Sequence, residues 1–161
     1  MPNSLATAIQ NTFEALVAGM NTSLPGEIVN YDFKKKEASV KPLIKKKFLN
    51  GDTLVLPVIN GVPVVFPGTA RTGIHFPLKK GDSVLLVFSQ RSLDKWLESG
   101  ADVDPGDSRK FNLTDAVAIP GLTSFNKGNF AENNEDIFIK TDKRKVKIGN
   151  ATNELTDGVL T

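Results

Sequence analysis

The sequence contains no cysteine and only one histidine, His75, among its 161 residues. Without cysteine the chain cannot form a disulfide, a thiolate nucleophile, or a cysteine-ligated zinc or iron–sulfur site. One histidine also excludes a multi-histidine metal site within a single chain. Hydrophobic residues make up 40% and charged residues 24%, which is the composition of a globular domain rather than of a disordered chain.

Long hydrophobic runs are missing as well. No stretch of about 18 apolar residues predicts a membrane-spanning helix. The N-terminus lacks the basic start of a signal peptide, and polar residues at positions 10–12 break its apolar stretch. We therefore expect the protein to be made in a cytoplasm.

Residues 4–20 carry the one long helical pattern of the sequence. Ser4 predicts the N-cap of this helix, and Gly19 predicts its end. Such an apolar stripe packs on its own domain by default, or it docks on another subunit. The apolar residues recur every three or four positions and are Leu5, Ile9, Phe13, Leu16, Val17 and Met20.

From Pro25 onward the pattern changes to short strands, which predicts a mainly β fold with a small barrel. Prolines within this region mark edges, bulges and strand ends. Residues 92–99 predict a short helix capped by Ser92, and residues 113–122 return to the barrel. We expect strands over 28–33, 38–48, 53–59, 62–66 and 83–89, a short extended segment over 73–78, and turns at 34–36, 50–52 and Asn60-Gly61.

The C-terminal part has a nine-residue rhythm, because Ile137 is followed by Val146 and Ile139 by Ile148. A two-stranded unit is marginal alone, but identical copies around one axis would bury these four side chains together. This predicts a cyclic homo-oligomer, most naturally a trimeric β-helix or β-prism. We expect an N-terminal helix over 1–23, the barrel over 24–123, a linker over 124–134 and a short stalk over 135–161.

No pattern predicts catalysis, a metal or a cofactor. His75 lies in a strand-like Ile-His-Phe-Pro context, and no serine has an elbow motif around it. Asp102, Asp104 and Asp107 fail the EF-hand spacing because Gly106 stands where a ligand is required. We interpret this segment as an exposed acidic loop, and we expect a protein that is not an enzyme.

Charge is unevenly distributed along the chain. The net charge is +2, whereas residues 34–47 hold seven lysines and one glutamate, so this segment is +6 and the remainder −4. The lysines either form a solvated hairpin that faces water or an acidic protein, or they bind single-stranded nucleic acid. The first interpretation is favoured because the segment has no arginine. The lysines are Lys34, Lys35, Lys36, Lys41, Lys45, Lys46 and Lys47.

Two predicted strands, 54–59 and 84–88, are apolar on both faces, whereas a strand exposed to water on one side alternates. One face fills the barrel. The outer face therefore requires a helix of the same chain or a neighbouring subunit.

Several segments in order resemble one known family, the central-spike, membrane-piercing baseplate proteins of contractile-tailed phages. The resemblance covers their N-terminal OB-fold domain, from about Leu24 to Leu122. Its segments are Leu24-Pro25-Gly26, Leu56 through Pro67, His75 through Leu78 with Gly81-Asp82, Trp96, Arg109, Phe111 through Ala116, and Ile119 through Leu122.

The resemblance implies a homotrimer in the virion tail baseplate that is attached to the tail hub and made in the cytoplasm of the bacterial host. Such a spike pierces the cell envelope when the tail contracts, so contact with the host membrane is transient and no nucleic acid is expected as a partner. The N-terminal helix is an addition to this pattern and would dock on the hub or on the end of the tape-measure protein. Related spikes often end in a His-x-His iron tip, and no histidine follows His75. The tip would therefore be free of metal or be supplied by a separate spike-tip protein.

Overall fold

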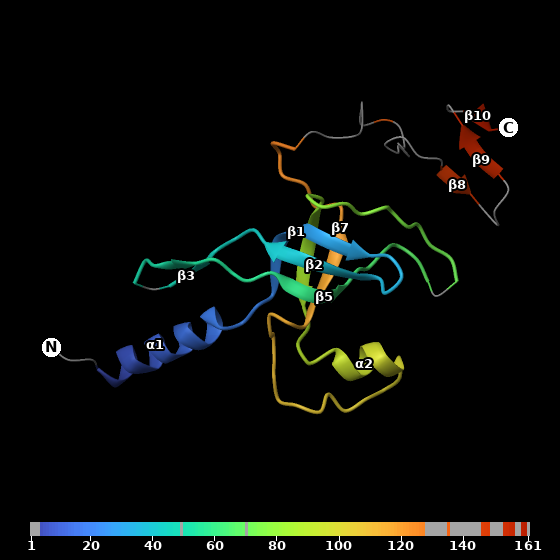
Figure 1. Cartoon of the computed structure of the whole chain (residues 1–161). Helices are drawn as coiled ribbons and strands as arrows, with labels where there is room; N and C mark the ends of the chain where they lie inside the picture. The colour runs from blue at the N-terminus through green and yellow to red at the C-terminus, as the bar shows by residue number, and fades with distance from the viewer. Residues whose placement is uncertain are drawn as a thin grey trace. The chain divides into compact units, whose positions relative to one another are not determined.

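The computed structural model describes residues 4–48, 50–69, 71–127 and 135, and the backbone of three short strands within 146–160 (Figure 1). The chain forms two compact units, Met1–Thr123 and Ser124–Thr161. Neither of the two described helices is long and apolar enough to cross a bilayer.

Helix α1 spans Leu5–Ala18, as its apolar periodicity predicts. The Ser4 side chain accepts a hydrogen bond from the Thr7 N–H at 3.3 Å, which satisfies one of the free donors at the helix start. At the other end, the Gly19 N–H donates to the carbonyls of Ala15 and Leu16. Both predicted ends are confirmed, because capping depends only on neighbouring residues.

The first unit is built on one curled five-stranded antiparallel sheet with the order β5-β2-β1-β6-β7 (Figure 1). Beyond β5, Val64 forms a parallel bridge with Ala118 of β7, so the two outer strands of the sheet meet. The predicted mainly β fold is thus confirmed as a half-barrel. The strands are β1 (Ser23–Asp32), β2 (Glu37–Pro42), β5 (Ile59–Pro63), β6 (Ser83–Phe88) and β7 (Ala116–Pro120).

Two β-bulges bend this sheet. Strand β1 has one extra residue between Ile28 and Asn30 relative to β2. Strand β5 has one extra residue between Ile59 and Val62, where Gly61 takes a φ of +69°. A bulge increases the local twist and bends its strand, which is how so short a sheet curls. The predicted hairpin turn at Asn60-Gly61 is therefore wrong, because this glycine serves a bulge within β5.

The core lies on the concave side of the sheet and consists mainly of small and β-branched side chains. Gly26 of β1 lies beneath it, and a Cβ at this position would be 2.7 Å from Cγ1 of Val40. The packing of the core therefore requires glycine at position 26. The buried residues are Ile28, Ala38, Val40, Ile59, Val62, Val84, Leu86, Phe88, Ala116 and Ala118.

Three further predictions need correction. The apolar run 53–59 is not one strand: Thr53–Leu54 forms the short strand β4, which pairs with β3 (Lys46–Lys47) in a separate hairpin, and Ile59 begins β5. Residues 74–78 have no regular secondary structure. Helix α2 spans Asp94–Ser99 with Leu93 at its N-cap, so Ser92 does not cap it.

The second unit contains β8 (Val146–Ile148), β9 (Asn153–Thr156) and β10 (Val159–Leu160). They form an antiparallel sheet of order β10-β9-β8 in which Val146 is opposite Leu155 and Ile148 is opposite Asn153. Of the four residues assigned to the trimer axis, Val146 and Ile148 therefore lie in a strand. Ile137 and Ile139 lie outside the described residues, so the predicted nine-residue rung stays a prediction.

The packing above Gly26 makes a testable prediction. Gly26→Ala should lower the free energy of unfolding by about 1–3 kcal/mol, because the new methyl group overpacks the core against Val40 and Leu86. In the double variant with Val40→Ala, the methyl group occupies space that the valine leaves. The combined loss, measured by urea denaturation, should be smaller than the sum of the single losses. Strict additivity would contradict the proposed contact.

Candidate interaction surfaces

A buried carboxylate at the start of β7 anchors the long connection from β6. Asp115 is 2% exposed, and its Oδ1 accepts hydrogen bonds from the Leu93 N–H and from Nη2 of Arg109, both at 3.1 Å. Its Oδ2 lies 2.9 Å from Nε of Arg109 in an ion pair. One side chain therefore holds both the start of α2 and the end of the following loop against the sheet.

Arg109 also contacts Ser92 and two acidic residues at the surface. Nη2 donates to Oγ of Ser92 at 2.6 Å, which explains why this hydroxyl does not cap α2. The hydrogen bond that Arg109 donates to Asp94 raises the pKa of Arg109 most. Desolvation lowers this pKa, and the hydrogen bond donated to Asp115 raises it again. Because its charge is permanent, Arg109 offsets the buried carboxylate at every pH that the fold tolerates. Neither Arg109 nor Asp115 was assigned this role from sequence, where they appeared only within the resemblance.

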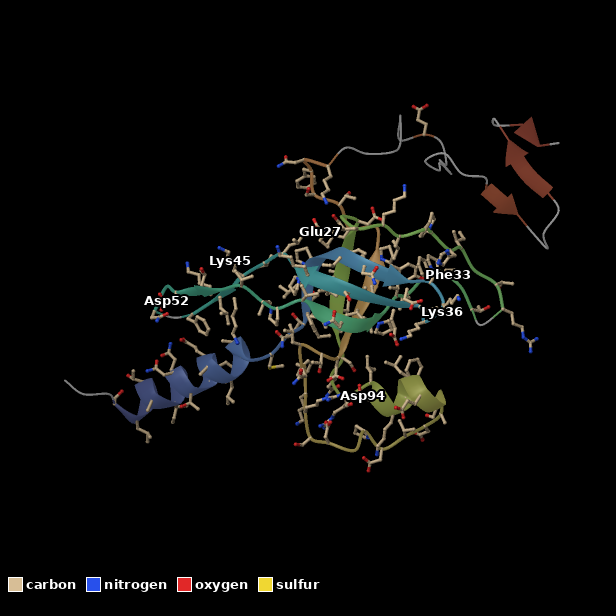
Figure 2. All side chains as sticks on the ribbon, viewed as in Figure 1. Glu27, Phe33, Lys36, Lys45, Asp52 and Asp94 are labelled. Carbon is tan, nitrogen blue, oxygen red and sulfur yellow. The ribbon has the colours of Figure 1, made fainter. Side chains whose placement is uncertain are left out.

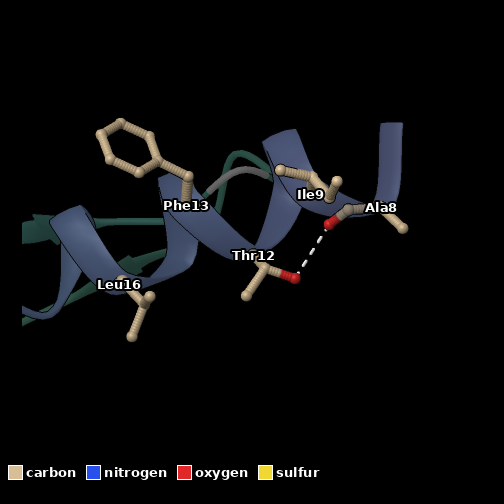
Figure 3. Close-up of a pocket in the computed structure, with 5 residues that line it drawn as sticks. All are labelled: Ala8, Ile9, Thr12, Phe13 and Leu16. Atoms are coloured by element: carbon tan, nitrogen blue, oxygen red, sulfur yellow. Dashed lines mark hydrogen bonds between the residues drawn. The ribbon is translucent and has the colours of Figure 1, made fainter. Parts of the chain in front are cut away.

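The apolar stripe of α1 is not covered by its own domain. No residue of the helix is buried, and its large apolar side chains are between 49% and 78% exposed. Figure 3 shows one side of the helix, where Ile9, Phe13 and Leu16 line a shallow hollow together with Ala8 and Thr12. A 14-residue helix is marginal when isolated in water. The helix therefore does not pack on its own domain in the single chain, and its apolar stripe is accessible to another subunit.

The outer face of the sheet also carries apolar side chains. Leu85 of β6 is opposite Pro25 of β1 on one side and Ile119 of β7 on the other. Val87, on the same face, is opposite Val117. Val87 is 36% and Ile119 40% exposed, so neither helix of the chain fully covers this face. Within the run 54–59, Leu54, Val55 and Val58 are likewise exposed, whereas Ile59 belongs to the core.

Aromatic rings gather around His75, outside any regular strand. Its ring centroid lies 4.4 Å from that of Phe66 and 5.1 Å from that of Phe33. The Tyr31 hydroxyl lies 3.3 Å from Nε2 of His75. Burial raises the pKa of Tyr31, and the charge of Asp32 raises it further. The described part of the chain brings no three potential metal ligands together, and His75 packs among rings.

The seven lysines lie on two separate hairpins. Lys34–Lys36 form the turn between β1 and β2, where Oδ1 of Asp32 accepts hydrogen bonds from the N–H groups of Lys34 and Lys35. Lys45–Lys47 belong to the β3–β4 hairpin, and Lys41 lies in β2 between them. Figure 2 shows Lys36 and Lys45 at opposite sides of the sheet. The +6 segment is therefore two basic clusters rather than one continuous patch.

Residues 24–121 match the model of one protein family, described as the phage protein Gp138 N-terminal domain. The match covers 98 of the 161 residues and runs from β1 to the end of β7, including the Arg109–Asp115 anchor. The chain belongs to this family of phage proteins, which confirms the resemblance at the level of a phage protein family. No curated protein matches the chain.

The Arg109–Asp115 anchor gives a stability prediction. Arg109→Met should lower the free energy of unfolding by about 3–5 kcal/mol, because it leaves the Asp115 carboxylate buried without a cation. Arg71→Met, at an exposed loop position, is the matched control and should change stability by less than about 0.5 kcal/mol. Thermal and urea denaturation measure the stability of both variants. Equal losses of stability in the two variants would contradict the proposed role of the Arg109–Asp115 contact.

The single tyrosine gives a pH prediction. Because burial and Asp32 favour the neutral phenol, the native state binds this proton more tightly than the unfolded state. The contribution of Tyr31 to the free energy of unfolding should therefore be constant below pH 10.0 and fall as the pH rises through the raised pKa. Phenolate absorbance should have its midpoint above 10.0 in the native protein and near 10.0 in urea. Asp32→Asn should remove only part of the difference between the native and unfolded midpoints, since burial is the larger cause. The control variant Asp52→Asn should leave this difference unchanged.

Proposed function

We propose that this chain is a structural component of a phage tail baseplate, the homotrimeric central spike or the base of that spike. The family match over residues 24–121 carries the proposal. In this role the chain attaches to the tail hub, and contraction of the sheath drives it through the host cell envelope. Its contribution is mechanical, and no residue acts as a catalyst or holds a cofactor.

The half-barrel supports the OB-like part of the proposal. Three consecutive antiparallel strands are followed by two that return to the other side of β1, and the parallel bridge from Val64 to Ala118 brings the outer strands together. This is the order of a small, partly open Greek-key barrel. Such a barrel would form the collar of the spike, with α1 available for the hub or for the end of the tape-measure protein.

The second unit would supply the stalk. In a trimeric β-helix each chain contributes one side of the structure, and interchain hydrogen bonds together with an apolar axis give stiffness. Ile137, Ile139, Val146 and Ile148 would line that axis.

The proposal predicts that the purified protein is a trimer at micromolar concentration in light scattering, and that antibodies against it label the tail tip of virions. Ile148→Asp should dissociate the trimer because a charge would enter the apolar axis. Lys147→Asp is the matched control, since neighbouring residues of a strand point to opposite faces. A stable monomer without label on virions would overturn the proposal. Binding of single-stranded oligonucleotides that falls steeply with salt would instead support a nucleic-acid-binding barrel.

A further inference from the structure

The connection between β6 and β7 has an acidic surface that is only partly neutralised. Residues 98–107 hold four acidic side chains, all of them exposed, and no lysine or arginine. Asp107 pairs with Arg109 at 3.5 Å. Within the described part of the chain, Glu98, Asp102 and Asp104 form no ion pair. The Arg109–Asp115 anchor and its contact with the Leu93 N–H tie the residues on either side of this segment to the sheet.

An open hollow lies beside this acidic segment. Its volume is about 520 Å³, and it is lined by the apolar side chains Leu93, Trp96 and Val103, together with Asp102 and Arg91. Trp96 is 52% exposed, which is high for the largest apolar side chain of the protein. The hollow therefore offers an indole and other apolar atoms at its wall and one charge of each sign in its lining, while Glu98 and Asp104 of the acidic segment are neighbours of its lining residues in the sequence.

The β3–β4 hairpin has the complementary properties. We name residues 43–55 the lysine arm. None of its described residues is buried, and it carries Lys45, Lys46 and Lys47 in succession. Its exposed apolar side chains are Leu43, Ile44, Phe48, Leu54 and Val55. In the single chain, Figure 2 shows Lys45 and Asp94 of α2 on different sides of the sheet, so the arm does not fold back on its own α2.

We propose that the lysine arm of one copy docks in the hollow beside α2 of the next copy. Lysine ammonium groups would meet the carboxylates of Glu98, Asp102 and Asp104, while the apolar side chains of the arm would cover Trp96. Opposite charges orient such a contact and exclude wrong registers, and the buried apolar area holds it together. The inference rests on the proposed homo-oligomer and names the surfaces that build it.

The arm and the hollow are different surfaces, so their contact is heterologous. Repeated around an axis, a heterologous contact closes into a ring, and each copy gives one arm and receives one. This distinguishes the proposal from a two-fold dimer, in which a residue meets its own counterpart or exchanges contacts symmetrically.

Cysteine cross-linking tests the geometry directly, because the natural chain has no cysteine. Lys45→Cys and Asp102→Cys are made in separate chains, which are mixed, refolded together and oxidised. A covalent dimer should form in the mixture and not in either variant alone. The double variant should give a covalent trimer on a denaturing gel. Lys80→Cys, at an exposed turn, replaces Asp102→Cys as the control and should give no cross-link with Lys45→Cys.

Charge reversal tests the energetics. Changing Lys45, Lys46 and Lys47 to Glu should weaken association by at least about tenfold, and changing Glu98, Asp102 and Asp104 to Lys in the same chain should restore it. The matched control reverses Lys34, Lys35 and Lys36, which alters the net charge equally on the other hairpin and should leave association unchanged. Far-ultraviolet circular dichroism verifies that each variant is folded.

The outcomes separate this inference from the proposed function. A trimer that labels virions but gives no Lys45–Asp102 cross-link would overturn the docking of the arm and leave the spike assignment intact. A monomer absent from virions would overturn both. If reversing the three arm lysines abolished oligonucleotide binding and left association unchanged, the arm would be a nucleic-acid contact and the inference would be wrong.

Discussion

One buried carboxylate ties together the two ends of the connection between β6 and β7. Asp115 is almost inaccessible at the start of β7, and a charge in that position requires a cation and hydrogen-bond donors. Arg109 and the Leu93 N–H supply them from the two ends of the same connection. The contact thus fixes α2, the acidic segment and the hollow between them as one surface. This polar interaction therefore sets where the hollow beside α2 lies on the surface of the protein.

The other constraint is the small size of the core. Ten apolar residues are buried in the described part of the chain, while 22 large apolar residues are exposed there, most of them on α1, α2, the lysine arm, the outer sheet face and the 66–78 segment. Isolated exposed apolar residues are ordinary, but continuous stripes and faces mark places of association. The sheet therefore has a buried core of its own but leaves continuous apolar surfaces exposed to water. Covering these surfaces is the physical reason to expect assembly.

Features controlled by neighbouring residues could be predicted from sequence, and those controlled by distant ones could not. The cap at Ser4 and strand β6 follow from local pattern. Gly61 was misinterpreted because a turn and a bulge need the same positive φ, and only pairing with β2 decides between them. Ser92 has the chemistry of an N-cap, but its hydroxyl accepts from Arg109, 17 residues away. The hollow beside α2 could not be predicted either, because Arg109 and Asp115 place it through contacts that the sequence pattern does not contain.

The register of the sheet has a mechanical consequence. The chain enters the barrel at Ser23, opposite Val87, and leaves it at Pro120, opposite Val84. A load applied between Ser23 and Pro120 can therefore pass from β1 through β6 to β7 by the shorter hydrogen-bonded route. Strands β2 and β5 provide a second, longer route, because Val64 beyond β5 bridges to Ala118 of β7. Two sets of hydrogen bonds would therefore have to break before these two points of the chain could be pulled apart.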